Sequence, residues 1–456
     1  MQKKSIHFLF MKRILVLGAG LSSGYLIEYL ANVCDKNAWT MTVADGNFEA
    51  LKAKTSKYPT IKAKRFDLEH EADAEVLFRN HDVVISLMPA FLQAKVATYC
   101  LKYRKHLLTA SYCTPEIRGM EGRVKAYGLI FMNELGLDPG IDHLSAMQMI
   151  DKIHAEGGKI HTFYSYAGAL VSPESDTNPW HYKFTWNPRN VVLAGQGTPV
   201  KYLEDDRYRY IPYQQVFKQL TNISIKGQGN FEGYANRDSM VYKEIYHLNE
   251  VKTLLRGTLR RPGFAKAWDI LVELGLTNNE FIIENANQLS YKDLLESFLK
   301  PHPTLSMQER LLHHTGRPDD RESLEKIEWL GIFSDDKIKL QRGTPAEILL
   351  ELLEKKWRLN PEDKDMIVMQ HRFLYHKDGK EYEAIAELTV VGERSPHTAI
   401  AKTVGLPLAI GTKLLLQGHL DHLSGILLPT DRAMYEPILH ELKDYGVIFN
   451  EKIREI

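Results

Sequence analysis

A glycine turn between an apolar strand and a helix constrains this chain more than any other feature. The segment RILVLGAGLSSG carries a short β-branched run and then Gly18, Gly20 and Gly24, and SSGYLIEYLANVC continues with apolar residues at helical spacing. A second strand, WTMTVADGN, ends in Asp45, about 20 residues further on. This succession of strand, turn, helix and strand predicts the start of a doubly wound parallel sheet that binds a dinucleotide.

Asp45 bears on the choice of dinucleotide. Gly18 allows the tight turn, Gly20 lets the backbone approach a pyrophosphate, and the helix start supplies partial positive charge. A carboxylate at Asp45 accepts hydrogen bonds from both ribose hydroxyls and repels a 2′-phosphate, so NAD(H) is favoured. In the alternative, Asp45 only caps the turn DGN, and Lys52 or Lys54 accommodates NADP(H).

The spacing of apolar residues changes along the rest of the chain and divides it into regions. The apolar runs IKAKRFDL, HDVVISLMP, HLLTASY and LIFMNEL alternate with helical segments, which predicts that the parallel sheet continues to about residue 136. Aromatic strands such as KIHTFYSYAGAL and KTLLRGTLRR predict a second α/β domain, and helical signals fill the chain from Gly263 to about Arg342. The segment from Asp365 predicts a β-hairpin around Asp378-Gly379.

Composition excludes several classes of protein. Lysine plus arginine equals aspartate plus glutamate, 58 each, so no global charge attracts nucleic acid or an anionic membrane. The three cysteines, Cys34, Cys100 and Cys113, have no metal-ligand spacing and indicate a reducing compartment, which we expect to be the cytoplasm. No apolar run approaches the roughly 18 residues of a spanning helix, and MQKKSIHFLF is too short for a signal peptide.

Motifs along nearly the whole chain resemble one family. VVISLMP, LLTASYCTP, FMNELGLDPGIDHL, PESDTNPWHYKFTWNPR, YANRDS, RGTLRRPGF and WLGIFSD occur in the order found in the saccharopine reductase family, the glutamate-forming saccharopine dehydrogenases. The resemblance implies an α/β fold with a variant Rossmann domain (1–137, completed by a C-terminal helix at 425–456), a substrate and dimerisation domain (138–262 with 343–424) and a helical domain (263–342). It also implies a homodimer that interconverts saccharopine with glutamate and α-aminoadipate semialdehyde in lysine metabolism.

The same resemblance implies the site. Tyr112 and Asp138 end strands beside the nicotinamide and are the candidates that manage the proton of the reacting amine. The predicted substrate-binding residues are Ser111, Tyr112, Asp138, Arg237, Thr258, Leu259 and Arg260. The predicted cofactor-binding residues are Gly18, Gly20, Leu21, Ser22, Ser23, Asp45, Leu87, Met88, Pro89, Ser111, Leu137, Asp138 and Pro139. Without the family match, each arginine is more simply a salt-bridge partner at a surface or between domains.

Other residues near these motifs receive supporting roles. We expect Glu134 to bond backbone in the bend after the strand, Asp142 to cap a helix starting near His143, and His143 to be packed. His419, Asp421 and His422 are read as a loop, and no metal is expected. Two departures from fungal members stand out: Asp45 replaces a basic group, and SYAGALVSPE has Ala167 where they carry a cysteine.

Two other functions remain open from the sequence. A related amine or imino-acid oxidoreductase, such as a lysine dehydrogenase, would use the same cofactor turn on another substrate. A non-catalytic dinucleotide-binding sensor would bind nicotinamide without hydride transfer, which fits poorly with the presence of Tyr112, Asp138 and the arginines.

Overall fold

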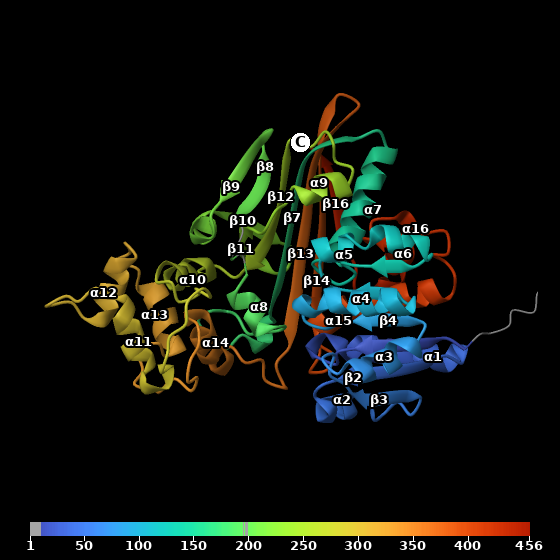
Figure 1. The fold of residues 1–456 in the computed structure, drawn as a ribbon. Helices are drawn as coiled ribbons and strands as arrows, with labels where there is room; N and C mark the ends of the chain where they lie inside the picture. Colours follow the sequence, from blue (N-terminus) through green and yellow to red (C-terminus); the bar gives the residue numbers. More distant parts are fainter. Residues whose placement is uncertain (1–10, 195, 197–198) are drawn as a thin grey trace, which may run out of the picture. The chain divides into compact units, whose positions relative to one another are not determined.

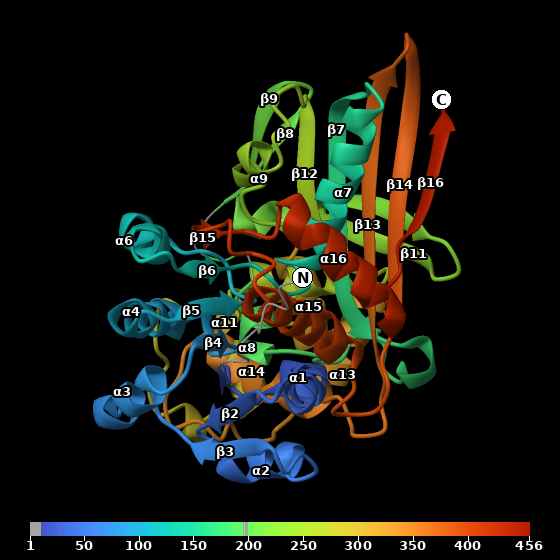
Figure 2. The same ribbon diagram turned by 90° about the vertical axis from the view of Figure 1, so that its right-hand side faces the viewer.

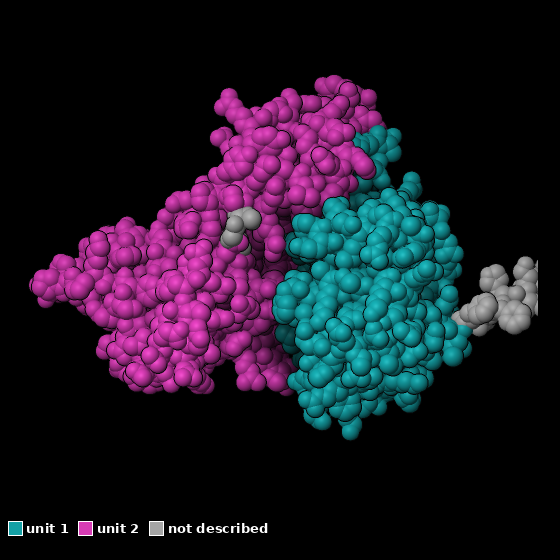
Figure 3. All heavy atoms as spheres, in the orientation of Figure 1, with its two compact units in different colours: residues 1–155, 390–449 teal, residues 156–389, 450–456 magenta. Residues whose placement is uncertain are grey.

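The structure is a computed structural model that describes residues 11–194, 196 and 199–456 (Figure 1). Compactness divides these residues into two units, coloured separately in Figure 3. Unit 1 contains the described residues up to Ala155 together with Val390–Phe449, and unit 2 contains Glu156–Thr389 with Asn450–Ile456. The N-terminal segment MQKKSIHFLF, which the sequence predicts to be too short for a signal peptide, lies outside the described residues.

Unit 1 is built on a parallel sheet of seven strands. The order is β15-β6-β5-β4-β1-β2-β3, and every pairing is parallel. Apart from β15, this is the 3-2-1-4-5-6 order of dinucleotide-binding domains, which confirms the predicted Rossmann fold. The strands are β1 (Arg13–Leu17), β2 (Thr40–Asp45), β3 (Ile61–Arg65), β4 (Val83–Ser86), β5 (His106–Thr109), β6 (Ile130–Met132) and β15 (Gly425–Leu427).

Helices cover both faces of this sheet. Figure 2 shows α3, α4 and α6 on one side and α1, α15 and α16 on the other. Close packing explains Gly24 of the turn motif, because a Cβ there would lie 2.2 Å from the Pro396 carbonyl oxygen. The helices are α1 (Gly24–Asn37), α2 (Phe48–Thr55), α3 (Glu71–Arg79), α4 (Gln93–Tyr103), α5 (Pro115–Arg118), α6 (Glu121–Ala126), α7 (Ile141–Ala155), α15 (Ala399–Leu416) and α16 (Arg432–Leu442).

Helix α15 corrects one expectation from the sequence. It has 18 residues and a mean hydropathy of 1.4, so by length and composition it could cross a membrane. However, 78% of this stretch is buried inside the protein, and α15 packs on α1 and α16. An apolar helix that is buried on nearly all sides is typical of a protein core.

Unit 2 contains a larger mixed sheet. Its path runs β10-β11-β12-β7-β13-β14-β16, and β8 joins β12 to β9. The hairpin predicted around Asp378-Gly379 is confirmed as β13 and β14. The strands are β7 (Lys159–Val171), β8 (Val200–Glu204), β9 (Arg207–Ile211), β10 (Leu220–Ile225), β11 (Gly229–Ala235), β12 (Thr253–Arg260), β13 (Asp365–Lys377), β14 (Lys380–Val391) and β16 (Asn450–Glu455).

An aromatic cluster joins this sheet to the helices of unit 2. Trp180, Phe264 and Trp357 pack edge-to-face or tilted with centroids 5.1–5.8 Å apart, and the Trp180 indole N–H donates to the Lys326 carbonyl. The helical signals after Gly263 are confirmed. The helices are α8 (Pro188–Val192), α9 (Val241–Ile245), α10 (Phe264–Glu273), α11 (Tyr291–Phe298), α12 (Met307–His314), α13 (Arg321–Leu330) and α14 (Pro345–Lys356).

The compact units differ from the predicted domain boundaries. The loop of Asp138 and helices α7 and α15 belong to unit 1 rather than to the substrate domain, because α15 packs against α1 and α7 against α16. The expected helix at 425–456 is instead β15, α16 and β16, and β16 pairs with β14 in unit 2. The helical region 263–342 falls within unit 2, and its standing as a separate domain stays a prediction.

Candidate functional site

The glycine turn lies between β1 and the first helix and is shaped to receive a pyrophosphate. Gly18 has φ +97°, and a Cβ there would lie 3.0 Å from the Leu87 carbonyl oxygen, so glycine is required. At Gly20 a Cβ would meet no atom within 4 Å, so this position opens onto free space. No side chain among the described residues caps the start of the short helix Leu21–Ser23 or of α1. The Ser23 N–H donates to the Gly20 carbonyl at 3.3 Å, but no side chain among the described residues competes with an anion at these helix starts. The residues therefore fit a dinucleotide.

The side chains of Asp45 and Lys54 form hydrogen bonds with the backbone of the glycine turn. The Asp45 carboxylate accepts hydrogen bonds from the backbone N–H groups of Ala19 (2.6 Å) and Asn47 (2.7 Å). The Lys54 ammonium donates to the carbonyl oxygens of Ala19 (2.6 Å) and Gly20 (2.5 Å), and burial lowers the pKa of this lysine. The Lys54 ammonium is therefore bound to the backbone of the turn, whereas the Lys52 side chain is exposed to solvent.

The other predicted cofactor residues of the turn divide by exposure. Leu21 is exposed, and Ser22 is partly exposed. Ser23 is fully buried, and its hydroxyl donates to the Gly20 carbonyl at 2.8 Å. The Ser23 side chain therefore faces the turn, and only its backbone could meet a ligand.

Leu87, Met88 and Pro89 follow β4, the neighbour of β1 where the strand order of the sheet reverses. The Leu87 N–H donates to the Leu17 carbonyl at 2.8 Å, which keeps this segment beside the glycine turn. Gln93 fixes the Met88 carbonyl at 2.7 Å. Ligands bind at such a switch point in doubly wound sheets, so the placement agrees with the prediction.

Asp138 is the accessible carboxylate of the segment FMNELGLDPGIDHL. Asp138 is partly exposed, whereas all the remaining residues from Leu129 to Met147 are buried. Glu134 and Asp142 retain 5% and 1% of their surface. The choice of Asp138 among the three carboxylates thus has a structural basis, although its catalytic role stays a prediction.

Two glycines shape the loop that carries Asp138. The Gly136 N–H donates to the Pro139 carbonyl at 2.9 Å, and the Ile141 N–H donates to the Gly136 carbonyl at 2.9 Å. Gly140 has φ +148°, and a Cβ on it would lie 2.0 Å from the Gly136 carbonyl oxygen. No side chain can enter there unless the loop moves.

We expect Gly140→Ala to destabilise the protein severely. The steric overlap with Gly136 should cost about 4 kcal/mol or more in the free energy of unfolding, measured by urea denaturation. Gly157→Ala is the matched control, because Gly157 also has a positive φ (+82°) but open space around it. The control should cost only about 1–2 kcal/mol of backbone strain. Equal losses in the two variants would contradict the close approach at Gly140.

Glu134 connects the two loops that end β5 and β6. One carboxylate oxygen accepts from the Cys113 N–H at 3.1 Å, and the other lies 2.9 Å from Nε2 of His143, which is fully buried. Because Cys113 directly follows Tyr112, this carboxylate fixes the segment of Ser111 and Tyr112 to the start of α7. The backbone bond predicted for Glu134 is confirmed, and His143 is packed as expected. Its pairing with Glu134 was missed, because nothing in the sequence aligns the two side chains.

The segment after β5 lies beside the Asp138 loop. Ser111 and Tyr112 are both half-buried, and the Glu134 N–H donates to the Ser111 carbonyl at 3.0 Å. Asp142 lies inside the first turn of α7 and accepts from the Gly140 N–H at 2.5 Å. It therefore ties down the glycine loop instead of serving as the expected cap. Unit 1 thus brings together the glycine turn, the β4 end, Ser111-Tyr112 and the Asp138 loop along the carboxyl ends of neighbouring strands.

The predicted arginine site lies in unit 2. Thr258 and Arg260 alternate with Leu259 along β12, so they share one face of the strand while Leu259 occupies the other. Asn236 donates to the Thr258 hydroxyl at 3.3 Å, a contact that sequence reasoning missed. Arg237, the next residue along the chain, is exposed and has φ +56°.

Arg260 is a buried cation without a carboxylate partner among the described residues. It is 8% exposed, and its guanidinium lies over the rings of Tyr182 (5.0 Å) and Phe264 (5.4 Å). Its Nε has no hydrogen-bond partner in the part of the chain that the structure describes, and one terminal nitrogen donates to the Leu259 carbonyl at 2.9 Å. Glu232, opposite Arg260 in the sheet, instead accepts from the N–H groups of Gly263 and Ala265. A guanidinium that is held between aromatic rings and keeps unused N–H donors is suited to bind a carboxylate.

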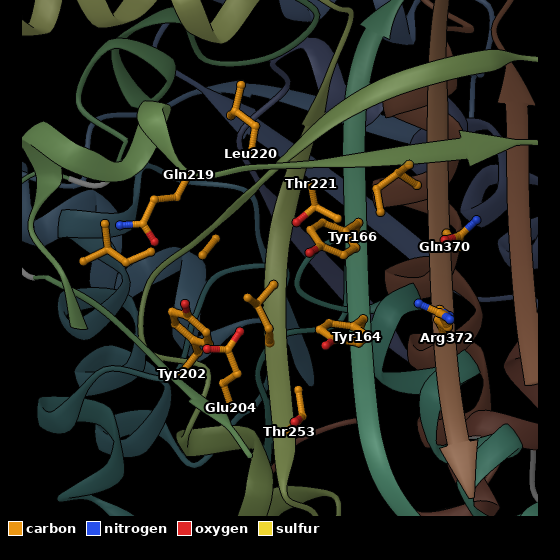
Figure 4. A pocket seen from close by; sticks show the side chains of 14 residues that line it. Tyr164, Tyr166, Tyr202, Glu204, Gln219, Leu220, Thr221, Thr253, Gln370 and Arg372 are labelled. Carbon is orange, nitrogen blue, oxygen red and sulfur yellow. The ribbon is translucent and has the colours of Figure 1, made fainter. Parts of the chain in front are cut away.

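A cavity of about 290 Å³ in unit 2 lies on the other face of β12 (Figure 4). Thr253 and Leu255 line it, whereas Thr258 and Arg260 alternate to the opposite face. Leu259 is fully buried and packs close to Gly168, so its side chain does not join the arginine site. Only the Leu259 backbone remains available for the predicted substrate contact.

Comparisons with known proteins agree with this architecture. The family model described as Saccharopine dehydrogenase NADP binding domain matches residues 14–190, and the one described as Saccharopine dehydrogenase C-terminal domain matches residues 136–447. The chain belongs to the saccharopine dehydrogenase family. This confirms the family, the α/β fold and a nicotinamide cofactor for this saccharopine dehydrogenase relative.

Individual relatives of this saccharopine dehydrogenase family member cover nearly its whole length. It is 33% identical over 97% of its length to Saccharopine dehydrogenase [NADP(+), L-glutamate-forming] of Schizosaccharomyces pombe, 99% of which is covered. It is 35% identical to the mitochondrial Alpha-aminoadipic semialdehyde synthase of Mus musculus, with 98% of this chain covered. The chain spans about half (49%) of that mouse protein. The apo saccharopine dehydrogenase (L-Glu forming) structure from Saccharomyces cerevisiae matches with a TM-score of 0.86 at 32% identity, covering 97% of this chain and all of that one.

Proposed function

We propose that the chain interconverts saccharopine with L-glutamate and α-aminoadipate semialdehyde by hydride transfer to or from a nicotinamide cofactor. The observation that supports this most is the 33% identity that extends over 97% of the chain and 99% of the S. pombe saccharopine dehydrogenase. The substrate carries a reacting amine and three carboxylates. The accessible Asp138 supports handling of the amine proton, and Arg260, which has no carboxylate partner among the described residues, supports binding of a carboxylate.

The residues divide the work of this reaction. The bound nicotinamide would accept a hydride from the carbon beside the secondary amine of saccharopine. Asp138 would take the proton of that amine and later direct the water that opens the resulting imine, and Tyr112 would be a second proton-handling group. Arg260, Arg237 and Thr258 would hold substrate carboxylates, and Glu134 would fix the position of Tyr112 through Cys113.

We propose NAD(H) as the preferred cofactor, although the names of the fungal relatives carry NADP(+). Asp45 supports NAD(H), since a carboxylate at the end of β2 repels a 2′-phosphate. Lys54 donates to the carbonyls of the glycine turn and is thereby withdrawn from a phosphate. The exposed Lys52 and Arg65 are the cations that an NADP(H) site would use.

Asp45→Arg should shift the preference toward NADP(H). The ratio of kcat/KM for NADP to that for NAD should rise about tenfold or more, because one charge-assisted hydrogen bond replaces one repulsion. Steady-state kinetics with both cofactors measures this ratio. Asp35→Arg, a similar change on the exposed face of α1, should leave it unchanged. An unmodified chain that already prefers NADP would refute the NAD(H) proposal.

The proposed activity is tested by following the absorbance of the reduced nicotinamide with saccharopine as substrate and lysine in a parallel reaction. We expect cofactor reduction with saccharopine and none with lysine. The reverse result would support a lysine dehydrogenase, and binding of cofactor without any reduction would support a sensor. The cytoplasmic location and the homodimer stay predictions.

A further inference from the structure

Three candidate metal ligands meet at one end of the unit 2 sheet. His161 of β7, His376 of β13 and Glu381 of β14 place their ligand atoms within 4.8 Å of one another. The two imidazoles stack with centroids 4.7 Å apart, and Nε2 of His161 lies 3.1 Å from the Glu381 carboxylate. Within the described part of the chain, this is the one group of three or more such ligands. The predicted loop of His419, Asp421 and His422 is not part of it.

A bulge in β7 aims His161 into this cluster. Leu374 pairs with Thr162 and Tyr375 pairs with Ile160, so the register skips His161. Adjacent residues of a regular strand point to opposite faces, yet Nδ1 of His161 lies 3.0 Å from the Thr162 hydroxyl. The bulge therefore turns the imidazole out of its normal direction, which is a common use of an extra residue in a strand.

The hairpin turn supplies the other two ligands. The two-residue turn Asp378-Gly379 has positive φ at both positions (+53° and +76°), as a tight hairpin requires. His376 lies two residues before this turn, and Glu381 lies two residues after it, so they flank the turn symmetrically. Figure 2 shows the end of this hairpin in orange. The stacked rings of Tyr375 and Tyr382 hold the next positions of the two strands together.

We propose that His161, His376 and Glu381 form a binding site for a divalent transition metal ion of the zinc type that links β7, β13 and β14. Two histidines and one glutamate are a known donor set for zinc, and they leave a fourth position for water. Ligand atoms on one tetrahedral zinc lie roughly 3.3 Å apart, so small side-chain rotations would close the site. This inference does not depend on the proposed function.

Further contacts agree with a metal site. Nε2 of His161 is shielded from solvent and has no well-directed hydrogen bond to any described residue, although Glu381 is close. The contact of Nδ1 with Thr162 orients the ring so that Nε2 faces the other ligands, as outer hydrogen bonds do for metal-binding histidines.

The test is a titration of the metal-stripped full-length protein with zinc sulfate alone, in which calorimetry measures the binding. We expect one zinc ion per chain and a higher melting midpoint in the presence of zinc, because an ion that binds only the folded state stabilises it. His376→Ala removes an exposed ligand, and Glu381→Gln removes the carboxylate charge while keeping its shape. Each should weaken zinc binding by at least about tenfold and reduce the rise in melting midpoint at the same zinc concentration.

His422→Ala is the matched control, because it removes an exposed histidine outside the cluster. It should leave zinc binding unchanged. Circular dichroism without zinc verifies that each variant is folded, and the two ligand variants provide independent tests. Zinc binding that is absent in the unmodified protein, or equally strong in His376→Ala and Glu381→Gln, would overturn the proposal.

Discussion

Asp138→Asn is expected to lower kcat for saccharopine oxidation by about 10²- to 10⁴-fold while changing KM much less. The reason is that Asp138 is the one accessible carboxylate between Leu129 and Met147, and a secondary amine that loses a hydride must also lose its proton. Asparagine keeps the size of the side chain and removes its basicity. Steady-state kinetics across a range of pH measures the effect.

The control for this variant is Asp35→Asn, the same chemical change on the exposed face of α1. It should leave kcat and the pH profile as they are. A merely structural role for Asp138 would lower the melting midpoint and leave the pH profile of the remaining activity unchanged. A normal kcat in Asp138→Asn would remove this residue from the proton-transfer role.

Arg260→Ala is expected to raise KM for saccharopine by roughly 30-fold or more, which corresponds to the loss of about 2 kcal/mol or more for a buried charge contact. The guanidinium lies over Tyr182 and Phe264, and no described carboxylate forms an ion pair with it, so its spare donors are available to the substrate. The affinity for the cofactor should not change. Saccharopine kinetics and cofactor titration separate the two effects.

Arg260→Lys and Arg209→Ala sharpen this prediction. Lysine keeps the positive charge but loses the planar pair of donors, so it should recover only part of the binding. Arg209 is half-exposed and pairs with Glu204 in the same unit, so its loss should leave KM unchanged. If Arg260 were only structural, Arg260→Ala would lower the melting midpoint and leave KM unaltered.

Local patterns predicted the parallel sheet and the glycine turn well, because each depends on residues close in sequence. The strand β1, the turn and β2 fall where the apolar run, the glycines and Asp45 place them. Helix α15 lies in unit 1, whereas the sequence placed it in the substrate domain, because its partner α1 lies far away in the sequence. The strand β16 was missed, since NEKIRE is exposed and charged and is extended only by pairing with β14.

In the candidate site, too, local sequence identified the residues, whereas their exposure and pairing depend on distant parts of the chain. The sequence and the family resemblance identified Asp138 and Arg260, but neither indicates which carboxylate keeps its exposure or which arginine lacks an ion pair. Those properties arise from long-range packing, such as Glu232 turning toward the start of α10. The bulge at His161 depends in the same way on the pairing of distant strands.

The central claim is tested most directly by product analysis of one reaction containing the full-length protein, saccharopine and NAD. The account predicts that glutamate and NADH form in equal amounts, one of each for every saccharopine consumed. Reduced cofactor without glutamate would contradict it, as would no reduction of NAD together with none of NADP in a parallel reaction.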